Sequence, residues 1–299
     1  MNTQAVSLFI NPTAGRGRAG LRSSRIEDTF TAAGIACHLQ MSKAVGDLES
    51  QVYDAVRNGA NRIVVAGGDG SIHEAVNGLM RSGGSAALGI IPTGTGNDFA
   101  KACAIPLDWE RATQQLVDRL SAAEPIRFID IGRVNNRFFA NGAGIGFDAK
   151  VTRVARSYRW PVGDVVYLLA IFRCMIDGIA TPDLTIRSDE FEWRGPVTLA
   201  NVSNGAWVGG MFHITPMASN NDGKLELLIA APVSRLRILS LLPKIIRGTH
   251  LSEPEVTHTS VRRLVVMAAE PVPSHLDGEV QALESNFDIE VLPAALGLL

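Results

Sequence analysis

The sequence predicts two domains of different class, an α/β domain over residues 1–129 and a mainly antiparallel, β-sandwich-like domain over residues 130–291. The chain has 299 residues, more than one compact domain usually contains. Before residue 129, short unalternating apolar runs are separated by helical patterns, which is typical of a parallel sheet covered by helices. After Pro125, short strand-like runs follow one another between turns. We expect the tail, residues 292–299, to pack back on the first domain.

The first domain is predicted to repeat the order strand, loop, helix. Its clearest strands are residues 6–10, 62–66 and 88–91, and its clearest helices are residues 21–33, 48–58 and 72–81. Right-handed crossovers between parallel strands place the loops that follow the strands at one edge of the sheet. Open α/β sheets bind their ligands at that edge.

The second domain is predicted to be antiparallel, because turn sequences such as Asp222-Gly223 and Asp277-Gly278 separate its strands. The expected strands are residues 137–141, 184–187, 197–202, 225–230, 261–267 and 287–291. Two helical stretches interrupt them, residues 150–179 and 234–247. The second contains Pro243, which predicts a kink or a split.

Composition and charge exclude several classes of function. The net charge of -2, from 28 basic and 30 acidic residues, provides no general field for nucleic acid. The three cysteines form no C-x-x-C pair, which argues against a disulfide framework or a thiolate zinc site and favours a reducing cytoplasm. The N-terminus does not have the pattern of a signal peptide. The most apolar windows, residues 165–172 and 236–246, are too short to span a bilayer, so any membrane contact at the inner face should be peripheral.

Three glycine-rich loops are candidate phosphate-binding segments, residues 11–17, 67–71 and 92–98. Glycine allows the backbone to approach phosphate oxygens, and the helix that follows offers unpaired N–H groups. Three such loops together indicate a polyphosphate ligand, although each alone can be a tight turn. Asp69 inside the second loop would repel phosphate unless a metal ion or N–H groups compensate its charge. Its alternative role is a helix N-cap.

Other well-known catalytic and nucleotide-binding motifs are absent from the sequence or incomplete in it. The sequence contains neither G-x-x-x-x-G-K-[ST] nor G-x-S-x-G, so the P-loop and esterase interpretations are excluded. Asn77 stands where H-E-x-x-H needs its second histidine, and His73 is interpreted as a surface histidine. Residues 15–20 read G-x-G-x-x-G, but residues 35–43 lack the acid that a dinucleotide site expects, which disfavours NAD or NADP.

Residues 66–78 resemble the G-G-D-G-[ST] signature of diacylglycerol-kinase-type catalytic domains. Residues 11–15, 92–100 and 141–148 resemble further segments of that family, and residues 276–279 and 292–296 resemble its bacterial YegS-like branch. The resemblance implies the NAD-kinase and diacylglycerol-kinase type of fold. It also implies an ATP-dependent kinase of a lipid hydroxyl, with diacylglycerol, phosphatidylglycerol or a related lipid as acceptor. NAD kinases and phosphofructokinases share the G-G-D-G theme, so the alternatives are a kinase of a soluble acceptor and a non-catalytic nucleotide sensor.

The resemblance also implies roles for particular residues. Glu279 is the expected base that accepts the proton of the acceptor hydroxyl, and Asp69 is expected to place catalytic magnesium. From its local sequence alone, Glu279 is an exposed acid after a hairpin turn. The residues expected to contact ATP are Asn11, Ser42, Ala66, Gly67, Gly68, Asp69, Gly70, Ser71, Ile72 and Thr95. A second Mg²⁺, or Ca²⁺ in its place, is expected at Asp222 with main-chain oxygens of Ser219 and Lys224.

Two clusters are candidates for lipid contact. The first gathers basic and aromatic residues near one predicted helix: Arg153, Arg156, Tyr158, Arg159 and Trp160. They fit anionic lipid heads or an ordinary solvated helix face. The second cluster is Leu236, Leu239, Leu242 and Ile246, for which core packing is the expected role. The sequence does not predict an oligomeric state.

Overall fold

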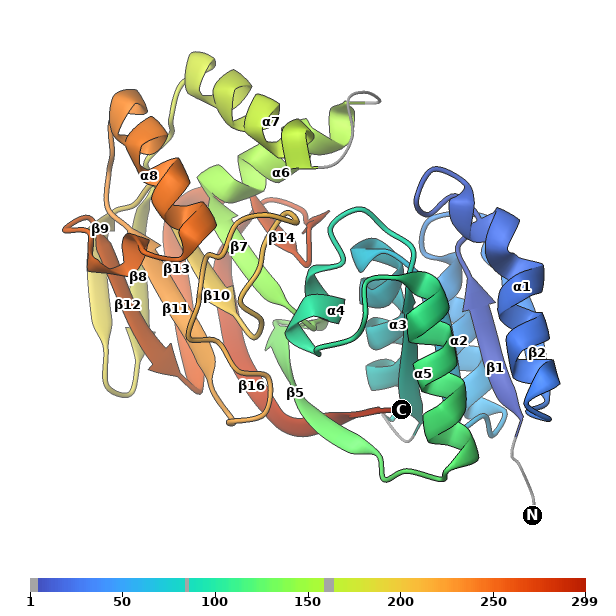
Figure 1. The fold of residues 1–299 in the computed structure, drawn as a ribbon. Helices are drawn as coiled ribbons and strands as arrows, with labels where there is room; N and C mark the ends of the chain where they lie inside the picture. The colour runs from blue at the N-terminus through green and yellow to red at the C-terminus, as the bar shows by residue number, and fades with distance from the viewer. Residues whose placement is uncertain (1–4, 84–85, 159–163) are drawn as a thin grey trace. The chain divides into compact units, whose positions relative to one another are not determined.

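The computed structural model describes residues 5–83, 86–158 and 164–299 of the chain (Figure 1). Two compact units make it up. The first comprises Met1–Ile129 together with Ala294–Leu299, and the second comprises Asp130–Pro293. Arg159 and Trp160 of the predicted basic and aromatic cluster lie outside the described residues.

The first unit contains a parallel sheet in the order β2-β1-β3-β4. Its strands are β1 (Val6–Ile10), β2 (Cys37–Met41), β3 (Arg62–Gly67) and β4 (Ala87–Pro92). The end of β16 (Glu284–Leu298) adds a parallel pairing of Leu298 with Leu88 of β4. Every residue of β4 is buried, because helices cover both faces of the sheet.

Five helices follow the strands of the first unit: α1 (Arg18–Ala32), α2 (Asp47–Arg57), α3 (Asp69–Ser82), α4 (Asp98–Ala102) and α5 (Trp109–Ser121). α1 packs against α5, and α2 packs against α3. Apolar residues from α1, α5, β1 and β3 form one continuous core, for example Ile26, Leu116, Leu8 and Val64. The alternation of strand and helix therefore places every strand-to-helix loop at the carboxyl edge of the sheet.

The second unit is built from antiparallel strands in two layers. One layer has the order β12-β11-β10-β7-β14-β15, and in the other β16 pairs with β13, β13 with β8, and β8 with β9. β5 pairs with β16 and β6. The strands are β5 (Arg127–Val134), β6 (Arg137–Phe139), β7 (Gly142–Gly146), β8 (Asp183–Ser188), β9 (Glu192–Pro196), β10 (Leu199–Ser203), β11 (Leu225–Ala230), β12 (Val256–Val261), β13 (Arg263–Val272), β14 (Ser274–Leu276) and β15 (Glu279–Val280). Side chains from both layers, such as Val202 and Val266, share one core. The predicted fold class is confirmed.

Three helices, α6 (Phe147–Ser157), α7 (Asp164–Ile176) and α8 (Arg235–Arg247), lie together at one end of the second unit and share a second apolar cluster (Figure 1). Within the predicted stretch 150–179 the structure has two helices, α6 ending at Ser157 and α7 beginning at Asp164. α8 continues through Pro243 as one helix and does not split. Within the described residues, no helix combines the length and the hydropathy that crossing a membrane requires.

Candidate functional site

The three glycine loops of the first unit converge at the carboxyl edge of its sheet. A Cβ atom on Gly15 would lie 2.1 Å from the Thr93 carbonyl oxygen, and one on Gly94 would lie 2.5 Å from Gly68 Cα. Neither approach is open to a residue with a side chain, so these glycines bring the backbones of the loops into direct contact. The geometry agrees with the shared edge expected from the sequence.

Hydrogen bonds tie several of the predicted ATP-contacting residues to one another. Asn11 Nδ2 donates to Ser71 Oγ at 3.0 Å, and the Asn11 N–H donates to the Ala66 carbonyl at 3.2 Å. Asp69 Oδ1 accepts a hydrogen bond from the Phe99 N–H in the first turn of α4 at 3.3 Å. The second and third loops are therefore linked by a carboxylate as well as by backbone contact.

The remaining predicted residues of this edge flank those loops. The Ser42 N–H donates to the Ile10 carbonyl at 3.0 Å, which places Ser42 directly after β2 beside the end of β1. Thr95 is exposed in the loop after β4. Nearby, Thr93 Oγ1 is buried without a hydrogen-bond partner among the described residues. A buried hydroxyl in a glycine loop is a group that a bound ligand could satisfy.

The edge has the properties of an anion cradle. Gly15, Arg16 and Gly17 have φ values of 59°, 64° and 81°, so three successive residues occupy the left-handed region. α1 begins after Gly17 and α3 after Gly68, and glycine has no side chain with which to cap the first N–H groups. Backbone N–H groups and helix dipoles at such positions favour phosphate.

His73 and Glu74 have structural roles in α3. His73 is 3% exposed, so the interpretation of this residue as a surface histidine is wrong. The reason is that α3 packs on α2 as well as on the sheet, which buries two of its faces. Glu74 Oε2 accepts a hydrogen bond from the Leu48 N–H at 3.1 Å and so caps the first turn of α2.

The second unit presents Glu279 at the start of β15, directly after the turn Asp277-Gly278. Both turn residues have positive φ, 51° and 82°, as a two-residue hairpin turn requires. The Asp277 carboxylate accepts hydrogen bonds from three backbone N–H groups, those of Ala140, Asn141 and Gly142, at 2.8 to 3.0 Å. This clamp fixes the turn to the start of β7.

Two further side chains hold the same turn. Arg156 of α6 donates to the Gly278 carbonyl at 3.1 Å and forms an ion pair with Glu279. His275, which is 2% exposed, accepts a hydrogen bond at Nδ1 from the Gly278 N–H at 3.3 Å. Its Nε2 lies 3.6 Å from Asp148 Oδ2. Since Nδ1 accepts, the neutral ring carries its proton on Nε2, facing the Asp148 carboxylate.

The turn that contains Ser219, Asp222 and Lys224 is anchored to Asp130. Asp130 Oδ2 accepts a hydrogen bond from the Gly223 N–H, and the Asp130 N–H donates to the Asn220 carbonyl, both at 2.7 Å. Asp222 is exposed, and its Oδ1 accepts a hydrogen bond from the Lys224 N–H at 3.0 Å. One carboxylate with main-chain oxygens is a donor set that suits a hard cation such as Mg²⁺ or Ca²⁺. The described residues contain no group of three or more His, Cys, Asp or Glu side chains placed to hold a metal, so these main-chain oxygens would be essential.

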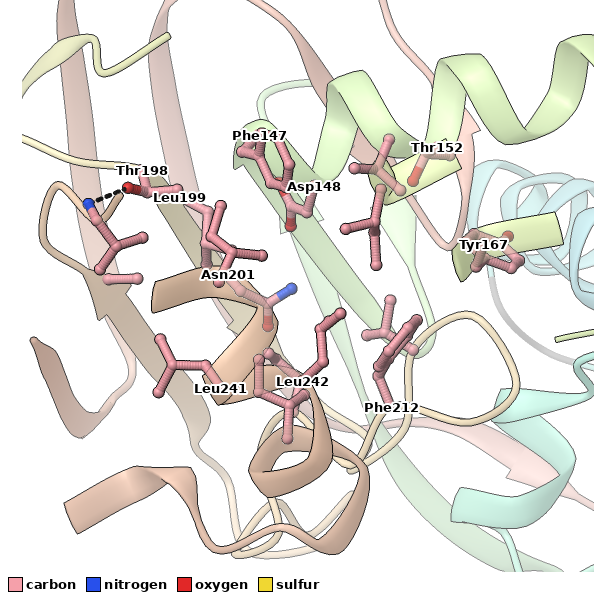
Figure 2. Close-up of a pocket in the computed structure, with 18 residues that line it drawn as sticks. Phe147, Asp148, Thr152, Tyr167, Thr198, Leu199, Asn201, Phe212, Leu241 and Leu242 are labelled. Carbon is pink, nitrogen blue, oxygen red and sulfur yellow. Dashed lines mark hydrogen bonds between the residues drawn. The ribbon is translucent and has the colours of Figure 1, made fainter. Parts of the chain in front are cut away.

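An apolar pocket lies between helices α6, α7 and α8 and the strands β10 and β11 (Figure 2). Its empty volume is about 840 Å³, counting the part open to solvent, which falls in the range of small-molecule sites. Eighteen residues line it. The polar ones are Asp148, Thr152, Tyr167, Thr198 and Asn201. The Thr198 hydroxyl is already engaged, because it donates to the Ala231 carbonyl and accepts from the Val233 N–H.

The loop that carries Val208, Phe212 and Ile214 along one wall of the pocket is anchored by His250. His250 is 1% exposed, and its Nε2 lies 2.9 Å from the Ile214 carbonyl oxygen. Burial lowers the pKa of His250 below its ordinary value. Because a carbonyl oxygen only accepts, Nε2 carries a proton and donates to Ile214. Burial likewise lowers the pKa of His213, which stacks on Trp207 with ring centroids 4.2 Å apart.

Comparison with known proteins matches both units to family models. Residues 5–132 match the model described as the diacylglycerol kinase catalytic domain, and residues 142–299 match the YegS C-terminal NAD kinase beta sandwich-like domain. The chain belongs to the diacylglycerol kinase family. The resemblance inferred from the sequence is confirmed.

Relatives and a solved structure agree with this family. The diacylglycerol kinase of Bacillus subtilis (strain 168) is 30% identical over 91% of this chain and 88% of its own length. A Yersinia enterocolitica protein named probable lipid kinase YegS-like is 32% identical over 88% of this chain and 86% of its own. The crystal structure of a diacylglycerol kinase from Bacillus anthracis (strain Sterne) has a TM-score of 0.76, covering 100% of this chain and 97% of that one, at 21% identity. This last likeness concerns the fold alone.

Membership of the diacylglycerol kinase family makes the protein an ATP-dependent kinase with an alcohol group as acceptor, and at the level of the family a lipid kinase. Such kinases generally use a divalent metal ion. Sequence reasoning found the glycine loops and Glu279, but it assigned no role to Asp148 or His275 and placed Arg156 only in a basic cluster. Asp148 closes the segment 141–148, and His275 directly precedes the segment 276–279, whereas Arg156 lies eight residues beyond the first of these segments. For Asp148 and His275, their position in or beside these motifs was the available signal.

Proposed function

We propose that this kinase phosphorylates a hydroxyl of diacylglycerol, phosphatidylglycerol or a related lipid, and that the pocket of the second unit holds the aliphatic part of that lipid. The observation that carries the proposal is the lining of the pocket, because 13 of its 18 residues are apolar. Its carboxylate, Asp148, lies 3.6 Å from His275, which in turn bonds the turn before Glu279. An aliphatic chain and a reacting hydroxyl need this combination of an apolar cavity and a nearby acid-base group.

The donor site is assigned to the glycine edge of the first unit. Backbone N–H groups of residues 66–72 would face the ATP phosphates, with Asn11, Ser42 and Thr95 around them. Asn11 would act by holding Ser71, to which it is hydrogen bonded. Asp69 would hold the catalytic Mg²⁺, which neutralises charge on the transferred phosphoryl group.

Glu279 is assigned as the general base. The acceptor oxygen forms a bond to the γ-phosphorus as the bond to the ADP oxygen breaks, and Glu279 Oε takes the hydroxyl proton. Arg156 orients the Glu279 carboxylate through their ion pair. The three hydrogen bonds that the Asp277 carboxylate accepts fix the turn that directly precedes Glu279.

A second cation, Mg²⁺ or Ca²⁺, is assigned to Asp222 with main-chain oxygens of Ser219 and Lys224. When bound, it would supply charge that stabilises the turn and would take no part in the chemistry. The turn is part of the second unit and is already bonded to Asp130, so this cation would act on the conformation of that unit.

A kinase of a soluble acceptor, as in NAD kinases, is the principal alternative. The pocket disfavours it, because a highly polar acceptor would lose its hydration against apolar side chains without gaining enough hydrogen bonds in return. A non-catalytic nucleotide sensor would not need the arrangement of Arg156, His275 and Asp277 around Glu279.

Radiolabelled ATP tests the proposal directly. The purified protein is incubated with ATP and Mg²⁺, and the acceptors are diacylglycerol or phosphatidylglycerol in detergent micelles, a total lipid extract, and NAD with other soluble alcohols. We expect label in the lipid phase. Label in a soluble acceptor alone would refute the lipid assignment, and the absence of label in every acceptor would favour the sensor.

A further inference from the structure

α7 is apolar on two opposite faces. One face, with Ala170, Ile171, Cys174 and Met175, is buried in the cluster that α7 shares with α6 and α8. The other exposes Val165, Leu169, Phe172 and Ile176, of which Phe172 is 46% and Ile176 72% exposed. Their spacing of four, three and four residues aligns them in a single stripe along the helix. An exposed stripe of this kind is unusual on a soluble surface and indicates a binding face.

The start of α8 adds two exposed leucines to the same end of the second unit. Leu236 is 79% exposed and Leu239 is 36% exposed, whereas Leu242 is buried in the shared cluster. Core packing, the role expected for this group, is therefore correct for Leu242 and wrong for Leu236. α7 and α8 pack on one cluster and wall one pocket, so their outer faces belong to one end of the unit (Figures 1 and 2).

The helices at this end are strongly basic. α6, α7 and α8 contain eight basic and two acidic residues, which leaves 20 basic and 28 acidic residues in the rest of the chain. Arg156, Arg173, Arg237 and Lys244 form ion pairs with acids close by, and Arg153, Arg235 and Arg247 are exposed. The positive charge that remains available to a partner therefore comes from the exposed arginines of α6 and α8, the helices that share an apolar cluster with α7.

We propose that this face, defined by the exposed stripe of α7 and the exposed leucines of α8, docks on an anionic lipid bilayer. Apolar side chains enter the interface while exposed arginines meet negatively charged headgroups. A second copy of the chain is a poorer occupant, because a two-fold contact would set the same excess of positive charge against itself. The inference rests on the proposed lipid acceptor, since the docking helices also wall the pocket.

Vesicle sedimentation tests the docking face with the full-length protein. The probes are vesicles of phosphatidylcholine with and without phosphatidylglycerol. We expect binding to the anionic vesicles that falls as salt is raised, and at least about tenfold weaker binding for the double variant Phe172→Glu/Ile176→Glu. Arg153→Glu/Arg247→Glu should weaken binding to anionic vesicles only. Leu21→Glu, at an 86% exposed position of α1, is the matched control and should bind as the unaltered protein does.

Activity on a short-chain diacylglycerol dissolved without vesicles separates this inference from the proposed function. We expect the double variant to keep this activity, because neither Phe172 nor Ile176 lines the pocket, and to lose phosphorylation of long-chain lipid in vesicles. If the unaltered protein phosphorylates the soluble lipid but does not bind anionic vesicles, the docking face is refuted and the proposed function stands. If it binds vesicles but phosphorylates no lipid, the proposed function fails instead. Equal vesicle binding by the double variant, or a dimer that the double variant dissolves, would also refute the docking face.

Discussion

The glycine edge of the first unit and the pocket region of the second unit are built in different ways. We call the first the backbone site, because backbone atoms shape it, and the second, which includes Glu279 and its turn, the side-chain site. At the glycine edge, the closest contacts between the loops are between backbones, as where Gly15 meets Thr93 and Gly68 meets Gly94. In the second unit, side chains make the arrangement: Asp277 clamps the turn, Arg156 and His275 are hydrogen bonded to Gly278 of that turn, and apolar residues of three helices line the pocket. The geometry of the backbone site depends on the positions of glycines in the sequence. The geometry of the side-chain site depends on which side chains tertiary packing brings into contact.

Glu279→Gln should produce the largest effect, because it removes the proposed base from the side-chain site and leaves the backbone site intact. We expect kcat to fall by roughly 10² to 10⁴, the usual contribution of general base catalysis, with little change in the affinity for ATP. Steady-state kinetics and ATP binding by calorimetry measure the two quantities. Glu270→Gln, at an exposed position of β13, is the control. Equal activity of the two variants would remove Glu279 from the mechanism.

Gly94→Ala should act on the backbone site alone. The new methyl group would lie 2.5 Å from Gly68 Cα and would push the second and third loops apart. We expect ATP to bind about tenfold more weakly or worse, a loss of roughly 1.4 kcal/mol or more, measured by calorimetry.

The control for this change is Gly34→Ala. Gly34 also lies in the first unit and has a φ of 73°, but a methyl group there meets open space. The substitution should cost about 1 kcal/mol of stability through backbone strain and leave ATP affinity unchanged. Equal ATP affinity in the Gly94 variant would show that contact between the loops is not needed for the nucleotide.

Ala230→Phe should narrow the pocket without touching the glycine edge. We expect KM for a long-chain diacylglycerol to rise by about tenfold, the size of effect that a few carbon atoms have in an apolar pocket, while a short-chain acceptor is affected much less. Ala269→Phe, at an exposed position of β13, is the control. A loss of the same size for both chain lengths would argue that the aliphatic chain lies elsewhere.

The smallest effect is expected in the pH dependence of stability, through His250 and the loop that it anchors. Burial lowers the pKa of His250 in the folded protein, so the unfolded chain binds its proton more readily. Stability should therefore be complete above the ordinary histidine pKa and should fall as pH drops below it, toward the lowered pKa of the folded state. His250→Gln should flatten this dependence in thermal melts between about pH 7 and pH 5. An unchanged slope would assign the pH dependence to other groups.

The same contrast explains what the sequence could predict. The glycine loops could be predicted from the sequence because a close approach of two backbones requires glycine, and the motif 67–71 contains three glycines. The turn at Asp277-Gly278 could be predicted for a similar reason, because positive φ values restrict the residues that can form it. In both places local backbone chemistry limits the choice of residue.

The pocket, and the contacts of Arg156 and His275 with the turn before Glu279, could not be predicted from the sequence in this way. Leu241 and Leu242 line the pocket, and Leu236, five residues before Leu241, is exposed, yet all three are leucines on one helix. Which of them faces inward depends on how α8 packs on α6 and α7, and that is a tertiary property. His73 shows the same limit, because its burial follows from the packing of α2 on α3 and not from its own local sequence.

The return of the chain's last residues to the first unit bears on the order in which the protein can be made. Leu298 pairs with Leu88, and the Leu299 N–H donates to the Leu88 carbonyl, so residues 294–299 cover the edge of β4 that faces away from β3. During synthesis on the ribosome, the whole second unit emerges before those residues do. Until then, this edge of the sheet in the first unit lacks its partner, because residues 294–299 are synthesised after the whole second unit.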